Sequence, residues 1–528
     1  MPVRPTRRDL LSAALVAGAA PLLPRVAIAA DALQFGPAVP FSFDVLQDIA
    51  RRLAQSPYET ADLGADVDVL ESIDYDTHNQ ITFRPGMTLW HGDPGAAKVR
   101  FFFPGRYFKE PVQINVVDNG QARELLFSTD LFDMPEDSPA RKLSRAGFAG
   151  FRVMDPEEKN DWLAVLGASY FRTSGYSGQF GMSARGLALD SGGPGPEEFP
   201  RFSRFWLEQG PAGGIVIYAL LEGPRVTGAY RMATSRNDGV FQDIDATIFV
   251  RGDIERLGIA PLTSMFWYGK HNHFLGPDWR PEIHDSDGLE MYLGNGERIW
   301  RPLNNPPWVT TNSFRADRLR GFGLAQRERS FEEFQDDGVF YEKRATVWVE
   351  PRGDWGQGSV MLVEIPTNDE IHDNIGAFWN PLAPAAVGKS FELSYKLSWV
   401  KDSPALPTAK FIATRIGAGG VPGQPRPANT VKFVLDLDGK GLEGFDRSSG
   451  VEAVVSASRG EVSLVYAFPI ATTDRWRVTF DLDIGAPEGP QDPIDLRLFL
   501  KHEDEAKSET WIYQAFPSQL HALLRQHA

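Results

Sequence analysis

The sequence contains no cysteine, and this absence excludes several kinds of chemistry. Without thiols, the chain of 528 residues has no disulfide bond, no thiolate nucleophile and no cysteine-bound metal. Excess positive charge is also lacking, because 70 acidic residues against 54 Lys and Arg leave a formal charge of −16. Nucleic acids and anionic membranes repel a negative surface. We therefore expect a neutral ligand and no nucleic-acid partner.

Short motifs of common enzyme classes are absent as well. The sequence has no phosphate-binding loop, no Gly-x-Ser-x-Gly elbow and no His-Glu-x-x-His motif. His271-Asn272-His273 lacks a clear third metal ligand. Asp285-Ser286-Asp287-Gly288 fits three interpretations, namely an incomplete calcium loop, a nucleotide-sugar motif or a plain Asp-Gly turn. We expect no organic cofactor and no essential metal.

An 18-residue apolar window is missing outside the N-terminal region, which instead has the features of an export signal. Arg7 and Arg8 precede the apolar run 10–20, which is too short to span a membrane, and Ala27-Ile28-Ala29 follows as a cleavage site. The alternative is an amphipathic helix. The pattern predicts a twin-arginine-type signal peptide over residues 1–29 and an exported mature protein.

Turn-forming and aromatic residues are plentiful, and they favour an all-β fold. The sequence holds 50 Gly, 39 Pro and 35 Phe, and its length exceeds that of a single core. The run 381–386 is typical of a linker, so we expect a large β-sandwich over 31–385 and a smaller domain over 386–520. Apolar and polar residues alternate from 391 to 399 and in two later segments. This period predicts an immunoglobulin-like β-sandwich for the smaller domain.

The stretch 364–379 concentrates acidic residues beside a proline. Read as helical turns after Pro366, it would place Glu370 and Asp373 on one face. An apolar stripe would lie on another face, formed by Ile371, Ile375 and Phe378. Acids gathered on an anchored turn can hold a proton for general acid catalysis. The alternative is that these acids merely favour a helix N-terminus.

Aromatic residues surround this stretch and suggest a sugar ligand. Seven of the 13 tryptophans lie between residues 265 and 380: Trp267, Trp279, Trp300, Trp308, Trp348, Trp355 and Trp379. Aromatic faces stack on sugar rings, and planar groups such as Arg301 and Asn304 bind hydroxyls. The alternative is that the tryptophans fill a sandwich core. Glycoside hydrolysis needs two carboxyl groups, which Asp285 and Asp373 could supply from separate segments.

The chain resembles the periplasmic glucan biosynthesis protein G/D family over nearly its whole mature length. The stretches that carry the resemblance are LGASYFR (166–172), GMSARGLA (181–188), EEFP (197–200), APLTSMF (260–266), GNGE (294–297), RPLNNP (301–306) and SETW (508–511). The export signal and the segment 283–287 resemble the D branch. The segment 368–370 instead follows the G-type pattern.

The resemblance implies a large sandwich with a long cleft and a role in making osmoregulated periplasmic glucans. It implies an inverting endo-β-1,2-glucanase, or a transglycosylase on the same site, with Asp373 as general acid, Asp285 as general base and Glu370 in the same network. We expect the glucan to contact Trp267, Trp279, Trp300, Arg301, Asn304 and Trp379. A membrane glucan synthase is the expected partner, and the oligomeric state stays open, a dimer included. The rival is a non-catalytic glucan-binding or scaffolding factor.

Overall fold

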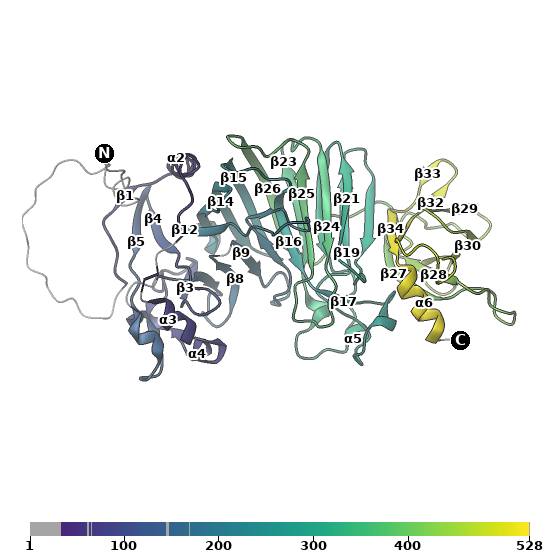
Figure 1. Ribbon diagram of the computed structural model, residues 1–528, viewed down its shortest axis with the longest axis horizontal. Coiled ribbons are helices and arrows are strands. Elements are labelled where there is room, and N and C mark those ends of the chain that lie inside the picture. Colours follow the sequence, from purple (N-terminus) through teal and green to yellow (C-terminus); the bar gives the residue numbers. More distant parts are fainter. Residues whose placement is uncertain (1–32, 61–62, 65, 144–146, 168, 527–528) are drawn as a thin grey trace, which may run out of the picture. The chain divides into compact units, whose positions relative to one another are not determined.

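The computed structural model describes residues 33–60, 63–64, 66–143, 147–167 and 169–526, and they form an all-β sandwich protein. Within these residues the largest sheet has 16 strands. Its path runs β1 (Val39–Pro40), β5 (Gln121–Leu125), β4 (Gln113–Asp118), β12 (Arg201–Gln209), β13 (Ile215–Glu222), β14 (Val226–Arg236), β15 (Val240–Val250), β26 (Ser390–Val400), β23 (Thr346–Arg352), β22 (Leu319–Ala325), β19 (Gly288–Leu293), β20 (Arg298–Pro302), β34 (Thr510–Ala515), β32 (Ile494–His502) and β29 (Val451–Ala457), with β33 (Glu505–Ala506) beside β32. Figure 1 shows β14, β15, β26 and β23 side by side. The all-β prediction is confirmed.

A second sheet faces the first across a shared hydrophobic core. Its strands, in order, are β21 (Thr310–Ala316), β24 (Gly358–Glu364), β25 (Ile375–Pro381), β16 (Leu257–Ser264), β10 (Ser183–Arg185), β9 (Tyr170–Thr173), β8 (Asp161–Leu166), β7 (Gly150–Met154) and β3 (Lys98–Phe102), with β11 (Leu187–Leu189) beside β16. Phe171 of this sheet packs against Trp399 of the first, with ring centres 6.1 Å apart. The Tyr230 hydroxyl also crosses the core and donates to the Gly186 carbonyl at 2.7 Å.

Local sequence explains why these segments form strands and short helices. In β15, buried Val240, Gln242 and Ile244 alternate with more exposed residues, as expected for a strand with one face on a core. The helices are α2 (Phe43–Leu53), which packs on β13, β14 and β15, and α3 (Asp66–Ser72), α4 (Tyr75–Asn79), α5 (Phe331–Phe334) and α6 (Pro517–Gln526). Two small pairs complete the strands, β17 (Phe266–Tyr268) with β18 (Ile283–His284) and β2 (Thr82–Phe83) with β6 (Phe132–Asp133).

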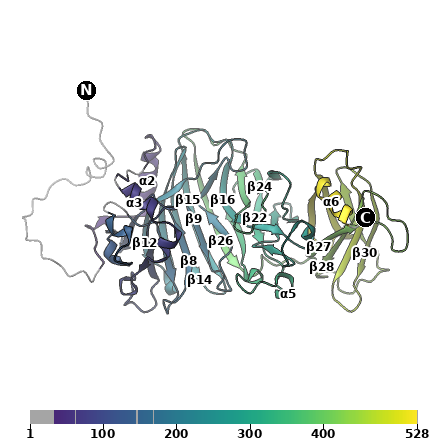
Figure 2. The ribbon, with the colours of Figure 1, turned by 60° about the horizontal axis from the view of Figure 1, so that its bottom comes forward.

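The C-terminal strands form a second, smaller sandwich. One sheet has the order β27 (Phe411–Ala418), β28 (Thr430–Leu437), β31 (Trp476–Asp483) and β30 (Val462–Pro469), and the facing strands run β34, β32, β29. In chain order these are the A-B-E-D and G-F-C sheets of an immunoglobulin-like domain, so that prediction is confirmed. Phe433 and Phe480 stack at 4.9 Å inside it. Figure 2 shows β27, β28 and β30 beside α6.

The linker prediction places one strand in the wrong domain. The alternating segment 391–399 was expected to open the smaller domain, yet β26 pairs with β15 and β23 in the centre of the large sheet. Alternation reports only that one face of a strand is buried, and it does not identify the partner strands. The smaller sandwich starts with β27 at Phe411.

The prediction of a helix after Pro366 is wrong. β24 and β25 pair from Gly358 with Pro381 to Glu364 with Ile375, and residues 365–374 form the loop between them. The Ile365 amide donates to the Asn374 carbonyl at 2.9 Å and closes the loop. The two strands pair along seven residues each, and this pairing decides the local structure in spite of the helical spacing of the apolar residues. Ile371, which was expected on a buried stripe, is 76% exposed.

The expected signal peptide, residues 1–29, lies outside the described residues. In the part of the chain that the structure describes, none of the helices has both the length and the hydropathy to cross a membrane.

Candidate functional site

Asp285 lies just after β18, in a buried position beside two arginines. Its backbone amide donates to the Met265 carbonyl at 2.9 Å, which fixes the chain next to β17. The Oδ1 atom lies 3.1 Å from Nε of Arg344, but the two are not aligned for a hydrogen bond and neither atom has another partner. Burial raises the pKa of Asp285 to about 6, against the opposing charges of Arg344 and Arg172. This carboxyl therefore titrates near neutral pH, and its buried Oδ1 is paired only with the charge of Arg344.

A glycine makes room for this pair. A Cβ atom at Gly181 would lie 2.7 Å from Cδ of Arg344 and 3.4 Å from Oδ1 of Asp285. The first distance is too short for a side chain, so Arg344 could not keep its position beside Asp285. Gly181 therefore permits the contact between the guanidinium and the carboxyl.

Asp373 lies near the end of the 365–374 loop, where its side chain is exposed. The next residue, Asn374, anchors the loop, because its side-chain amide accepts from the Phe266 amide at 2.8 Å and donates to the Phe266 carbonyl at 2.9 Å. The Asp373 side chain makes no hydrogen bond to any residue that the structure describes. Although the side chain is exposed, the protein around it removes part of the hydration of the carboxylate, and this desolvation raises the pKa of Asp373. The charge of Arg172 opposes the shift.

The two carboxyl groups lie close enough to influence each other. The charge of Asp373 contributes to the raised pKa of Asp285, and Arg172 acts on both groups. Asp373 also acts on Tyr170 of β9, whose pKa burial raises. Two carboxyl groups with raised pKa values, one buried beside a cation and one open to solvent, can divide the roles of base and acid.

Glu370 differs from both, because its carboxylate is fully engaged. Arg280 donates to both oxygens at 3.0 and 3.1 Å, and the Tyr341 hydroxyl donates to Oε2 at 2.5 Å. Arg280 also binds Asp278 and Asp336, so one guanidinium ties together the segment before β18, the segment after α5 and the Asp373 loop. This arrangement suits a residue that positions the loop.

Four of the six predicted sugar-binding residues are buried, which corrects that prediction. Trp300, Arg301, Asn304 and Trp379 are at most 4% exposed. Arg301 forms a buried ion pair with Glu364 at 3.0 Å, and the Asn304 amide donates to the same carboxylate at 2.7 Å. A buried indole face cannot stack on a sugar ring, so the core interpretation is the correct one for Trp300 and Trp379.

Trp267 and Trp279 remain as surface candidates. Trp267 is half-buried on β17, and Trp279 is 73% exposed next to Arg280, the residue that holds the Asp373 loop. An exposed indole beside a fixed polar network can offer a flat face to a sugar.

Sequence reasoning missed two arginines and a tyrosine of this site. Arg172 lies far in the chain from Tyr341 and Arg344, and nothing in the local sequence of these residues indicates that they face Asp285 or Asp373. Of these residues, only Arg172 lies in a stretch that carries the family resemblance, LGASYFR (166–172), and that stretch is the signal that could have identified it.

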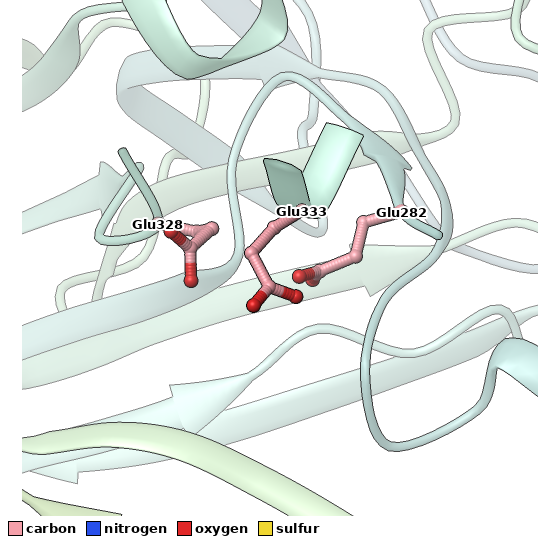
Figure 3. A group of neighbouring side chains, drawn as sticks. All are labelled: Glu282, Glu328 and Glu333. Atoms are coloured by element: carbon pink, nitrogen blue, oxygen red, sulfur yellow. The ribbon is translucent and has the colours of Figure 1, made fainter. Parts of the chain in front are cut away.

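Three carboxylates that could hold a metal surround a lysine instead. Oxygen atoms of Glu282, Glu328 and Glu333 lie within 4.8 Å of one another. Figure 3 shows the three side chains next to each other. The Lys270 ammonium lies 2.5 Å from Glu282, 2.5 Å from Glu328 and 3.2 Å from Glu333. It supplies at this point the positive charge that a metal ion would bring.

A cavity of about 1000 Å³ lies beside the loop 190–198. Glu197 lines it and also binds Arg185 at 2.7 Å, and the Arg185 guanidinium lies over the Tyr170 ring at 5.1 Å. The charge of Asp373 contributes to the raised pKa of Tyr170. Glu197, Arg185 and Tyr170 therefore form a chain of contacts from the cavity toward Asp373.

Comparison with known proteins gives consistent matches over the whole chain. Residues 41–515 match the family described as periplasmic glucan biosynthesis protein, MdoG. The chain is 48% identical to glucans biosynthesis protein D 2 of Ralstonia nicotianae, with 97% of this chain and 98% of the relative covered. It is 44% identical to glucans biosynthesis protein D of Xanthomonas oryzae pv. oryzae, with 98% of each covered. The protein of the same name from Stenotrophomonas maltophilia is also 44% identical, with 97% and 98% covered.

Proposed function

We propose that this chain, which belongs to the family of the periplasmic glucan biosynthesis protein MdoG, acts in periplasmic glucan biosynthesis by cleaving the β-1,2-glucan backbone. The observation that carries this proposal is the pair Asp285 and Asp373, whose pKa values are both raised in contrasting surroundings. The reaction is hydrolysis with inversion at the anomeric carbon.

In this mechanism Asp373 is the general acid. Its position at the surface lets the side chain reach the glycosidic oxygen of a bound polymer, and its raised pKa favours the protonated form that the step requires. The proton passes to the leaving hydroxyl as the bond between the anomeric carbon and that oxygen breaks.

Asp285 is the general base. Its carboxylate accepts a proton from the attacking water, directly or through a chain of waters, as the water oxygen bonds to the anomeric carbon, and Arg344 and Arg172 hold the ionised form against burial. Glu370 positions the loop through Arg280, and Trp279 supports the sugar ring.

Two other outcomes use the same site or the same surface. A transglycosylase would use the same two carboxyl groups with a sugar hydroxyl in place of water. A scaffolding factor would bind glucan without chemistry and influence a membrane glucan synthase. Among the described residues, no hydrogen bond joins Asp285 to Asp373, and Asp373 is exposed, which favours an enzyme over the scaffold.

The test is incubation with linear β-1,2-glucan, with products and their anomeric form followed by NMR. The unaltered protein is compared with Asp373→Asn, Asp285→Asn and the control Asp369→Asn, which changes an exposed acid of the same loop. We expect shortened chains of inverted configuration from the unaltered protein and the control only. New linkages would indicate a transglycosylase, and intact polymer bound equally by all four proteins would overturn the enzyme proposal.

A further inference from the structure

His284, directly before Asp285 in the chain, is fully buried on β18. Its ring stacks on Phe266 with centres 5.4 Å apart and meets the edge of Phe334 at 5.0 Å. Both ring nitrogens have polar partners: Nδ1 lies 3.0 Å from Oε1 of Gln326, and Nε2 lies 3.1 Å from Oε2 of Glu282. Which of these nitrogens carries a proton follows from what the two partners can do.

Gln326 can only accept from His284. Its Nε2 donates to the Tyr341 carbonyl at 3.0 Å and lies 3.4 Å from the His284 carbonyl. Turning the amide over would bring its oxygen against these two carbonyl oxygens. Its Oε1 therefore stays opposite Nδ1 of His284, which must carry a proton.

Glu282 is also an acceptor, because it is held ionised. The Lys270 ammonium lies 2.5 Å from its Oε1, and the Lys270 amide donates to its Oε2 at 3.2 Å. Burial alone would raise the pKa of Glu282, but His284 and Lys270 hold that pKa at about 2. An ionised carboxylate has no proton to donate, so Nε2 of His284 carries one as well.

We propose that His284 is a positioning residue: a buried imidazolium, protonated on both nitrogens, that keeps the neighbouring Asp285 ionised as the general base. The inference rests on the proposed function, since a base at Asp285 is needed only if the site performs hydrolysis. His284 acts through Asp285 and touches no substrate.

The charges around these two groups are consistent with this role. Burial and the charge of Lys270 lower the pKa of His284. The hydrogen bond to Glu282 and the charges of Asp287 and Glu282 raise it, and the net shift is upward. His271, also near, is neutral at pH 7 because burial lowers its pKa to about 4. The charges of Arg344, His284 and Arg172 all lower the pKa of Asp285, and the charge of Asp373 raises it. Tyr341 also lies within reach of Asp285, and its pKa is raised by burial.

The first measurement is the pH dependence of kcat/KM on linear β-1,2-glucan for His284→Gln and Glu282→Gln. The first variant removes the imidazole, and the second lets it become neutral while the ring packing stays. Loss of a buried cation raises the pKa of Asp285, so we expect the acid limb to move up by about one pH unit, with normal rates recovered above it. Phe334→Leu is the control, because it disturbs the same packing without changing charge. An equal loss of rate at every pH in both charge variants would overturn the proposal.

The second measurement needs no variant and no activity. In protein labelled with ¹⁵N-histidine, the two ring nitrogens of His284 report their protonation by NMR, with His284→Gln used to assign the signals. Two protonated nitrogens from pH 6 to 8 are expected, and a neutral ring at pH 7 would overturn the proposal. A protein that leaves the glucan intact would instead refute the proposed function, whatever the state of His284.

Discussion

Glu364 and Asp373 flank the same loop, yet their surroundings are opposite. Glu364 ends β24 and is fully buried, with hydrogen bonds from Arg301, the Asn304 amide and Thr310. Asp373 is exposed, with no side-chain hydrogen bond to the described residues. Burial raises the pKa of both carboxyl groups, so a raised pKa does not by itself identify a reactive acid.

The difference lies in what each carboxyl group has left to offer. The two oxygens of Glu364 are engaged by a guanidinium and several donors, which makes it a structural anchor between β24 and the chain after β20. Asp373 keeps its hydrogen-bonding capacity, and Oδ1 of Asp285 lies against Arg344 without a hydrogen bond. The two ends of the loop therefore differ: Glu364 is engaged within the fold, and Asp373 is the end that the proposed mechanism uses.

The largest expected effect is the loss of glucan cleavage when Asp373, rather than Glu364, is changed. Asp373→Asn should lower the rate of β-1,2-glucan cleavage by about 10³-fold, because the general acid is lost. Since the side chain is exposed, the free energy of unfolding should change by less than about 0.5 kcal/mol. Initial rates and urea unfolding check both statements, with Asp369→Asn as the control. A variant that retains full activity would remove Asp373 from the mechanism.

The next effect concerns stability. Glu364→Gln leaves the buried Arg301 guanidinium without its anion, which should lower the free energy of unfolding by about 3 kcal/mol. Urea unfolding at pH 7 measures it, and the folded fraction should keep its glucan-cleaving rate. If Glu364→Gln were as stable as the unaltered protein but inactive, the contrast between the two ends of the loop would be wrong.

The pH profile sharpens the contrast at the second carboxyl group. Asp285 must be ionised to act as base, and its pKa is about 6. Because Asp373 must also be protonated, the rate should fall about tenfold for each pH unit below 6 and fall again at higher pH as Asp373 loses its proton. Measurement of kcat/KM between pH 4 and 8 checks this, and Glu364→Gln should show the same limb. An acid limb near pH 4 would mean that Asp285 is not the base.

The smallest effect compares an exposed tryptophan with its surroundings. Trp279→Ala removes a flat apolar face beside Arg280 and should weaken glucan binding about fivefold, which corresponds to about 1 kcal/mol. Trp308→Ala is the control, because Trp308 is also exposed but packs on Phe516. Calorimetric titration with the glucan measures both. Equal weakening in the two variants would argue against a specific role for Trp279.

Much of the fold could be predicted from local patterns. Alternation of apolar and polar residues identified β26, β31 and β32 as strands, because a strand with one face on a core imposes a period of two. The same pattern could not assign β26 to a sheet, since its pairing with β15 and β23 depends on residues about 150 and 50 positions away. The acidic loop was read as a helix because spacing is ambiguous in short apolar segments.

The candidate site could be predicted in part. Asp285 and Asp373 were found because acids beside aromatic residues suit glycoside hydrolysis and because the chain resembles a known family. The buried Trp300 and Arg301 were misjudged, since residue type indicates what a side chain can bind but not whether a ligand can reach it.

By itself the sequence determined the excluded chemistry, the all-β class and the family, because these depend on composition, local period and long matching stretches. The tertiary structure alone decided which acids are engaged and which are free. Arg172 and Arg344 act on Asp285 through space, from segments far from it in the chain. Charge and burial at such a point are set by neighbours that only folding brings together.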